Sequence, residues 1–216
     1  MMNAPAASSV ETDKPVGPRS RKGVRTRARL LEAAKEIFEE NGFLDARISD
    51  IAERAGLSHG SFYHYFESKE EIFREVARAQ EEDLSLHSIV ASGLLATGDV
   101  SMRDRVESSI RQYLGAYQAE AAIMGVIEQV SRYDTEVRSA RLAMQGTYTK
   151  QTEDAIRYLQ AHGLADPHLD PVTTAAALSA MVSRFSEMWF VQGQVHAAFE
   201  DGVDQLATLC VNALQL

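Results

Sequence analysis

The residues from Ser58 to His64 have types and spacing suited to contacting DNA. Ser58 is a favourable N-cap, and His59, Gly60 and Ser61 follow it as short or polar residues at the start of a helix. Such side chains can reach base edges in a major groove, and the free N–H groups of a helix N-terminus attract phosphate. We therefore expect His59, Gly60, Ser61 and Tyr63 to point outward from a recognition helix.

A basic stretch precedes this segment. Seven cations occur with no acidic residue among them: Lys14, Arg19, Arg21, Lys22, Arg25, Arg27 and Arg29. A basic stretch leading into a helix is typical of a phosphate-binding surface. The alternative is a solvated, disordered arm, and taken alone the stretch fits that interpretation better.

Two short helices must position these side chains. Ile48, Ile51, Ala52 and Ala55 have helical spacing, and Gly56 ends that helix with a turn. Leu57 and Phe62 are expected to fill the small core, with a brief second helix after Ser58. A helix, a short turn with glycine and a second helix form a helix-turn-helix.

Longer helices are predicted on both sides of the two short helices. Leu30, Ala34, Ile37 and Phe38 form one apolar face of a helix that Asn41-Gly42 is expected to stop. Ser68-Lys69-Glu70-Glu71 is a capping box that opens another helix. Further helices are predicted around Val106–Tyr117, Ile123–Val130 and Leu142–Leu159, from Asp170-Pro171 to about Gly193, and over Phe199–Leu214. No alternating strand is evident, so the fold class is all-α with about nine helices.

The composition and motif content of the chain exclude several classes of protein. The 216 residues carry a net charge of −9, but the whole acidic excess lies from Glu81 onward, so it does not exclude DNA binding by the N-terminal part. The single cysteine, Cys210, excludes an internal disulfide framework. We find no catalytic or nucleotide-binding motif, and the six histidines lack metal-ligand spacing, so we expect no enzyme, metal or cofactor. No targeting or membrane segment is evident, which predicts a cytoplasmic protein.

The segment Thr26–Phe73 resembles the N-terminal domain of the TetR family of transcriptional regulators. The residues that carry this resemblance are Ala33-Ala34, Phe38, Asn41-Gly42-Phe43, Ile51-Ala52, Ala55-Gly56-Leu57-Ser58, Gly60-Ser61-Phe62-Tyr63, Tyr65-Phe66, Ser68-Lys69-Glu70 and Phe73. The remainder resembles the family in length and helical character. The resemblance implies a flexible basic arm over 1–21, a helix-turn-helix domain over 22–68 and a helical ligand-binding and dimerisation domain over 69–216.

The resemblance also implies roles for single residues. His59, Gly60 and Ser61 match base-facing positions, Tyr63 and His64 match backbone-facing positions, and Lys69 matches a phosphate contact. Arg47 departs from the family, which usually has a capping Ser or Thr there. Arginine could hold a phosphate instead, with Asp45 as a substitute cap. The DNA-binding candidates are Arg47, Ser58, His59, Gly60, Ser61, Tyr63, His64 and Lys69. The alternatives are that Tyr63 and Tyr65 pack on the first helix, that His64 is an ordinary surface residue and that Lys69 pairs with a neighbouring acid.

Large apolar residues concentrate in the second half. At helical spacing such residues are most often core, but Gly115, Gly125 and Gly146 interrupt these helices where alanine would be more stable. The family generally holds an inducer between such helices. The ligand-binding candidates are Tyr113, Tyr117, Met124, Met144, Tyr148, Phe185, Met188 and Trp189, and the ligand is expected to be small and mostly apolar.

The resemblance further implies a homodimer through the last two helices. One candidate face holds Ala176, Ala180, Ser183 and Glu187; another holds Leu178, Met181, Phe185 and Met188. A dimer places two recognition helices in successive major grooves, so the double-stranded DNA site should be palindromic. We expect a repressor that the ligand releases from this operator. The alternative is a helix-turn-helix protein without an effector, either architectural or controlled by a protein partner.

Overall fold

The structure is a computed structural model that describes residues 20–86, 94–95 and 100–216. Within these ranges it contains nine α-helices and no strand, which confirms the all-α expectation. The helices are α1 (Arg21–Asp45), α2 (Ile48–Arg54), α3 (His59–Phe62), α4 (Lys69–Leu86), α6 (Met102–Ala119), α7 (Ala121–Ser131), α8 (Thr135–Ala161), α9 (Pro171–Ser186) and α10 (Phe199–Leu214). A π-helical turn, Glu187–Val191, extends α9, and most of the basic arm lies outside the described residues.

Buried phenylalanine side chains form the core of the helix-turn-helix domain. Phe38, Phe62, Phe66 and Phe73 are fully buried, and the ring of Phe38 meets that of Phe73 edge-on at 5.0 Å. Gly42 breaks α1 with a φ of +71°, where the stop was predicted. The chain then makes one more turn, because Phe43 packs between Phe38 and Phe73.

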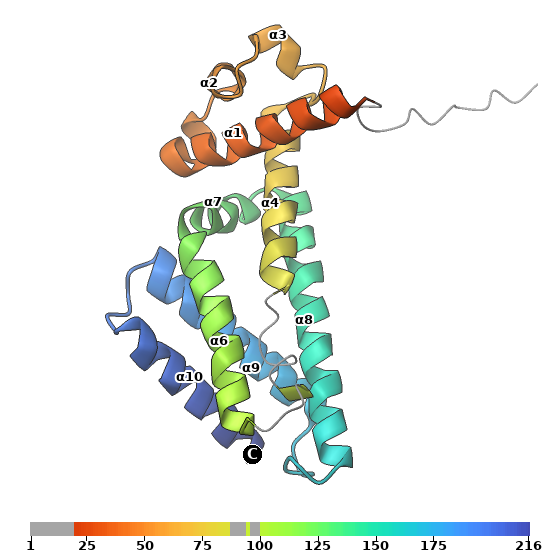
Figure 1. Ribbon diagram of the computed structural model, residues 1–216, viewed down its shortest axis with the longest axis vertical. Coiled ribbons are helices and arrows are strands. Elements are labelled where there is room, and N and C mark those ends of the chain that lie inside the picture. The colour runs from red at the N-terminus through yellow and green to blue at the C-terminus, as the bar shows by residue number, and fades with distance from the viewer. Residues whose placement is uncertain (1–19, 87–93, 96–99) are drawn as a thin grey trace, which may run out of the picture.

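The other helices form the effector domain, which is drawn below α1 in Figure 1. α4 descends from the helix-turn-helix domain and packs along α8, while α8 packs on α9 and α6 on α10. α10 has its predicted bounds, and Asp170 caps α9 by accepting from the N–H of Thr173 at 2.9 Å. α8 begins at Thr135, before the predicted Leu142, because Asp134 caps an earlier turn.

Ion pairs hold α1 and α4 against the rest of the effector domain. Lys35 of α1 lies 2.5 Å from Glu120, the residue between α6 and α7. Arg74 of α4 lies 2.9 Å from Asp134 at the start of α8. The first pair therefore holds the helix-turn-helix domain against the effector domain, and the second holds α4 to α8 within the effector domain. None of the helices in the described ranges is long and apolar enough to cross a lipid bilayer.

Candidate DNA-binding surface and effector domain

The recognition helix α3 is short and anchored at both ends. The Ser58 hydroxyl accepts a hydrogen bond from the Ser61 N–H at 3.2 Å, which confirms the predicted N-cap. Phe62 is fully buried, while His59 and Gly60 are exposed and Ser61 is half-buried. The buried phenylalanine fixes the helix, so its polar residues face solvent as base contacts would require.

Of the three residues that follow α3, two are exposed and one is partly buried. Tyr63 is 49% exposed, and its ring meets the His59 ring edge-on at 5.4 Å instead of packing on α1. His64 is also exposed, whereas Tyr65 is half-buried against the core. His59, Tyr63 and His64 therefore lie next to one another on the surface.

Arg47 occupies the N-cap position of α2. Its backbone is extended, it makes no capping hydrogen bond and its side chain is exposed. Asp45 lies at the end of α1, and within the described part of the chain it makes no hydrogen bond to α2. The guanidinium of Arg47 is thus accessible to an anion.

Lys69 has a structural role that the sequence did not reveal. Its Nζ donates to the backbone carbonyls of Phe43, Leu44 and Ala46 at 2.7, 3.1 and 2.9 Å. The ammonium also lies 4.7 Å from the centre of the Phe43 ring. Its partners are carbonyls and not a neighbouring acid, so Lys69 ties the start of α4 to the corner between α1 and α2.

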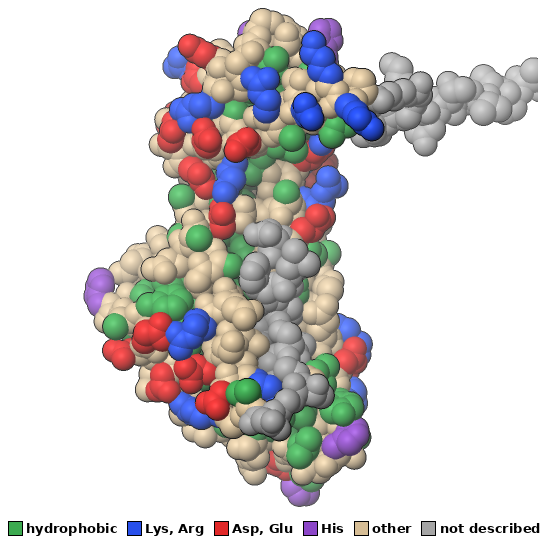
Figure 2. Space-filling view, viewed as in Figure 1, with side chains coloured by type: hydrophobic (Ala, Val, Ile, Leu, Met, Phe, Trp, Pro, Cys, Tyr) green, Lys and Arg blue, Asp and Glu red, His purple; other side chains and the backbone are tan. Residues whose placement is uncertain are grey.

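The cations of α1 divide into two groups. Arg27 pairs with Glu75 and lies over the Phe66 ring, and Arg29 donates to the carbonyl of Ala55. Arg21, Lys22 and Arg25 are exposed near the start of the helix. Lys and Arg side chains gather over α1 in Figure 2. Lys14 and Arg19 lie outside the described residues.

The side chain of Arg29 lies over the turn at Gly56. Its φ of +66° favours glycine, and a Cβ there would lie 2.7 Å from the Arg29 guanidinium. The guanidinium therefore covers the turn between α2 and α3 and satisfies the last carbonyl of α2.

The predicted ligand-binding residues lie on α6, α7, α8, α9 and the π-helical turn, and they differ in exposure. Three of them, Tyr113, Tyr117 and Met124, are buried; Met144, Tyr148, Phe185, Met188 and Trp189 are half-buried. The Tyr113 and Tyr117 rings are 5.9 Å apart, and Tyr117 is 6.3 Å from Phe190. Burial raises the pKa of both tyrosines above the usual value, so both stay protonated at neutral pH.

Trp189 belongs to a stacked aromatic group at the junction of α9 and α10. It stacks on Phe190 at 4.5 Å and on Phe199 at 6.2 Å. Gly202 of α10 lies beneath its ring, and a Cβ there would clash with the indole. Gly115 and Gly146, by contrast, have no atom within 4 Å of where a Cβ would lie. The sequence also singled out Gly125, where a Cβ would lie 3.1 Å from Val191, but it did not indicate the close packing at Gly202.

A buried charge pair lies beside the tyrosines. Arg141 of α8 approaches Glu81 of α4, with 3.3 Å between Nε and Oε1. The Tyr148 hydroxyl donates to the backbone carbonyl of Glu81 at 2.9 Å. Burial raises the pKa of Glu81, and the Arg141 charge opposes that effect. Sequence reasoning missed this pair, because neither residue belongs to a local motif.

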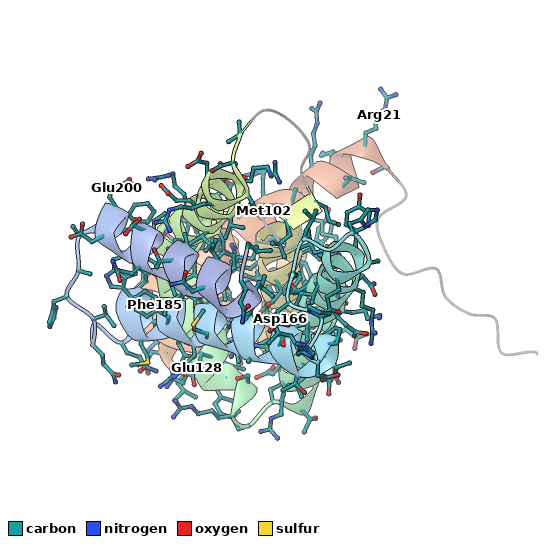
Figure 3. All side chains as sticks on the ribbon, turned by 90° about the horizontal axis from the view of Figure 1, so that it is seen from below. Arg21, Met102, Glu128, Asp166, Phe185 and Glu200 are labelled. Atoms are coloured by element: carbon teal, nitrogen blue, oxygen red, sulfur yellow. The ribbon has the colours of Figure 1, made fainter. Side chains whose placement is uncertain are left out.

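The two candidate dimer faces of α9 have different surroundings. Leu178 is buried, and Met181 and Phe185 pack partly against the core. Ala176 and Ala180 are exposed, as is Leu209 on α10. Figure 3 shows α9 and α10 side by side along one side of the effector domain. Small exposed residues on neighbouring helices permit a close approach by another helix pair.

Comparisons with known proteins agree with this geometry. Residues 30–76 match the family model described as bacterial regulatory proteins, tetR family. The chain is 31% identical to the HTH-type transcriptional regulator YdgC of Bacillus subtilis over 176 residues, which are 80% of this chain and 85% of that protein. It is also 43% identical over 70 residues to the repressor KstR2 of Rhodococcus jostii, which covers 32% of this chain and 34% of that protein.

A solved structure shows the same fold. The regulator FadR of Bacillus subtilis, in complex with stearoyl-CoA, superposes with a TM-score of 0.68 at 16% identity, covering 86% of this chain and 98% of that one. The helix-turn-helix geometry agrees with the family match and with the long alignment with YdgC, and all three indicate one family. The chain belongs to the TetR family of bacterial transcriptional regulators, which are DNA-binding proteins and not enzymes.

Proposed function

We propose that the protein is a homodimeric repressor that binds a palindromic operator through α3. The observation that carries this proposal is that α3, whose buried residue is Phe62, presents His59 and Gly60 to solvent with Ser61 half-buried, and that the exposed Tyr63 and His64 follow it directly. His59, Gly60 and Ser61 would read bases, while Tyr63, His64 and Arg47 would contact the backbone. Lys69, whose ammonium donates to three carbonyls, would contribute only its charge near the phosphates. Ser58 would hold α3 through its cap.

We further propose that a small, mostly apolar ligand in the effector domain releases the DNA. The aromatic group around Tyr113, Tyr117 and Trp189 supports this. FadR, which shares the fold, was solved with stearoyl-CoA, and the relative KstR2 is named a repressor. The ligand would shift the population towards a spacing of recognition helices that fits the operator poorly.

One observation favours a rival function without an effector. Tyr113, Tyr117 and Met124 are almost fully buried, as they would be in a filled core. Such a protein would be architectural or controlled by a protein partner, and small molecules would not change its DNA binding. The response of the DNA complex to ligands separates the two functions.

The first experiment is selection of bound sequences from a random DNA pool with the purified protein at near-physiological salt. A dimeric reader should enrich a palindrome, which then serves as the probe for ligand release. Gly60→Ala should retain the fold, since no atom lies within 4 Å of the added Cβ, but should weaken operator binding by about tenfold or more by obstructing base contact.

His168→Ala is the control, because His168 is exposed in the loop before α9, away from α3. It should bind the operator as the unmodified protein does. Equal affinity of Gly60→Ala and the unmodified protein would contradict the assignment of α3 as the reading helix.

A further inference from the structure

The charge pair between Glu81 and Arg141 is incomplete. The side chain of Glu81 is 8% exposed and that of Arg141 is 16% exposed. Neither Glu81 Oε1 nor Arg141 Nε makes a well-directed hydrogen bond to any described residue. Buried charges are costly unless their hydrogen-bonding positions are filled, so the guanidinium has unused capacity for another anionic partner.

Arg141 also lines a groove of about 320 Å³ between α8 and α9. Neutral hydrogen-bonding side chains surround it there: Gln145, Thr149, Ser179 and Ser183. Glu81 is not among the lining residues. The groove is therefore lined by Arg141 and not by the carboxylate with which it pairs.

The other two charges in the groove are already paired. Arg184 lies 2.6 Å from Glu187, and Gln192 donates to the same carboxylate at 2.8 Å. This leaves Arg141 as the lining cation with incomplete partners. Hydroxyl and amide groups beside an incompletely paired guanidinium are the donors that bind carboxylates and phosphates.

The groove lies beside the buried tyrosines, which are not among its lining residues. Ser183, which lines the groove, adjoins the deeply buried Tyr113, and Arg141 lies close enough to Tyr117 to favour its ionised form, although burial outweighs this and raises the pKa. Arg141 and Ser183 therefore contribute both to the groove and to the surroundings of two predicted ligand-binding residues. One molecule could place a charged group in the groove and an apolar part beside the aromatic rings.

We propose that this groove binds an anionic head group of the effector through Arg141, and that Arg141 exchanges Glu81 for the ligand as it does so. The inference rests on the proposed function and deepens it, because the effector becomes an amphipathic acid with a carboxylate or phosphate group. The exchange removes one tie between α8 and α4, the helix that enters the DNA-binding domain at Lys69.

The test compares four amphiphiles of equal chain length on the full-length dimer: dodecanoate, dodecyl phosphate, dodecanol and dodecylamine, all below their micelle concentrations. Trp189 is the sole tryptophan, so its fluorescence reports on the effector domain. One or both anions should bind at least about tenfold more tightly than the alcohol or the amine, and their comparison identifies the preferred head group.

Variants of the charge pair sharpen the test. Arg141→Gln should weaken anion binding by about tenfold or more. Glu81→Gln should leave anion binding intact or tighten it, because the internal competitor is gone; a cation site would behave in the opposite way. Arg157→Gln is the control, since Arg157 lies on α8 but pairs with Glu153 outside the groove.

Arg141→Gln leaves Glu81 buried without its cation, so the double variant Glu81→Gln/Arg141→Gln provides a neutral pair if the single variant fails to fold. Retention of anion binding by that double variant would overturn the proposal, as would equal or tighter binding of the amine or alcohol. So would the absence of any fluorescence response to both anions. The proposed repressor function is judged separately, by DNA selection and by release from DNA with other ligand classes.

Discussion

Single cations of the DNA-binding domain stabilise its own backbone. Lys69 binds three carbonyls at the α1–α2 corner, and Arg29 binds the carbonyl of Ala55 at the end of α2. Carbonyls at helix ends lack intrahelical partners, and cations there also favour the helix dipole. Their charge adds to the positive potential of this surface, but their positions are set by the fold.

We expect Lys69→Gln to destabilise the domain, because the shorter neutral side chain cannot replace three charge-assisted hydrogen bonds. The free energy of unfolding should fall by about 1.5–3 kcal/mol, measured by urea denaturation at fixed protein concentration. Lys22→Gln is the control, since Lys22 is exposed and should change stability by less than about 0.5 kcal/mol.

Measurements of stability and of salt-dependent DNA binding on the same variant distinguish a structural role of Lys69 from a phosphate contact. A residue that only contacted phosphate would leave stability unchanged and lower the salt slope of DNA binding by about one unit. That pattern in Lys69→Gln would contradict a structural role.

The helix elements show what local sequence can predict. α10 and the start of α9 have strong signals, an apolar face for the first and Asp170-Pro171 for the second, and both were predicted at the observed positions. The first half of α8 has no apolar periodicity: from 138 to 151 none of its side chains is fully buried. Its start was missed because the cap at Asp134 is followed by a largely solvated turn.

Local sequence likewise predicts only part of the candidate site. The recognition residues follow one another in the sequence, so local spacing was enough to find them. Glu81 and Arg141 are brought together only by the packing of α4 on α8, and the role of Lys69 depends on a corner more than twenty residues earlier in the chain. Pairings of this kind require the tertiary structure.

Asp134 supports two elements at once. Its carboxylate accepts from the N–H groups of Glu136 and Val137 at 2.9 and 3.0 Å and pairs with Arg74 of α4. Asparagine can still cap the helix but loses the charge. We expect Asp134→Ala to cost about 1–2 kcal/mol at pH 7, and Asp134→Asn less than about 1 kcal/mol. Asp154→Asn is the control, because Asp154 of α8 is exposed and caps nothing.

The pH dependence of Asp134 has a defined sign. Burial opposes its ionisation, but the hydrogen bonds from Val137 and Arg74 outweigh burial and lower its pKa below 3.8. A lowered pKa contributes stability that is fully present above the unfolded value and is lost as pH falls through the folded one. The unmodified protein should therefore lose its advantage over Asp134→Asn as the pH falls below about 4. A difference that persists undiminished at pH 2 would contradict this.

At the scale of the whole molecule, the position of the recognition helix depends on the effector domain. α4 is continuous between the two, and Lys35 with Glu120 forms a second connection. In a dimer the separation of the two α3 helices would follow from how the effector domains pack. A dimer through α9 and α10 would thus set the spacing of the half-sites.

Leu209 provides a test of that interface. It is 51% exposed on α10 and lies in one helical stripe with the exposed Gln205 and Asn212. Leu209→Glu places a charge where a second copy would pack, so sedimentation should show a mass near that of one chain in place of two. Affinity for the palindrome should fall by about a hundredfold or more, because the half-sites no longer bind as one unit.

Leu164→Glu is the matched control, since Leu164 is equally exposed but lies in the turn between α8 and α9. It should remain dimeric and bind the palindrome normally. Circular dichroism should show that both variants keep their helices. A folded, dimeric Leu209→Glu with full affinity would place the dimer interface elsewhere on the chain, and the half-site spacing would then have to follow from a different pair of helices.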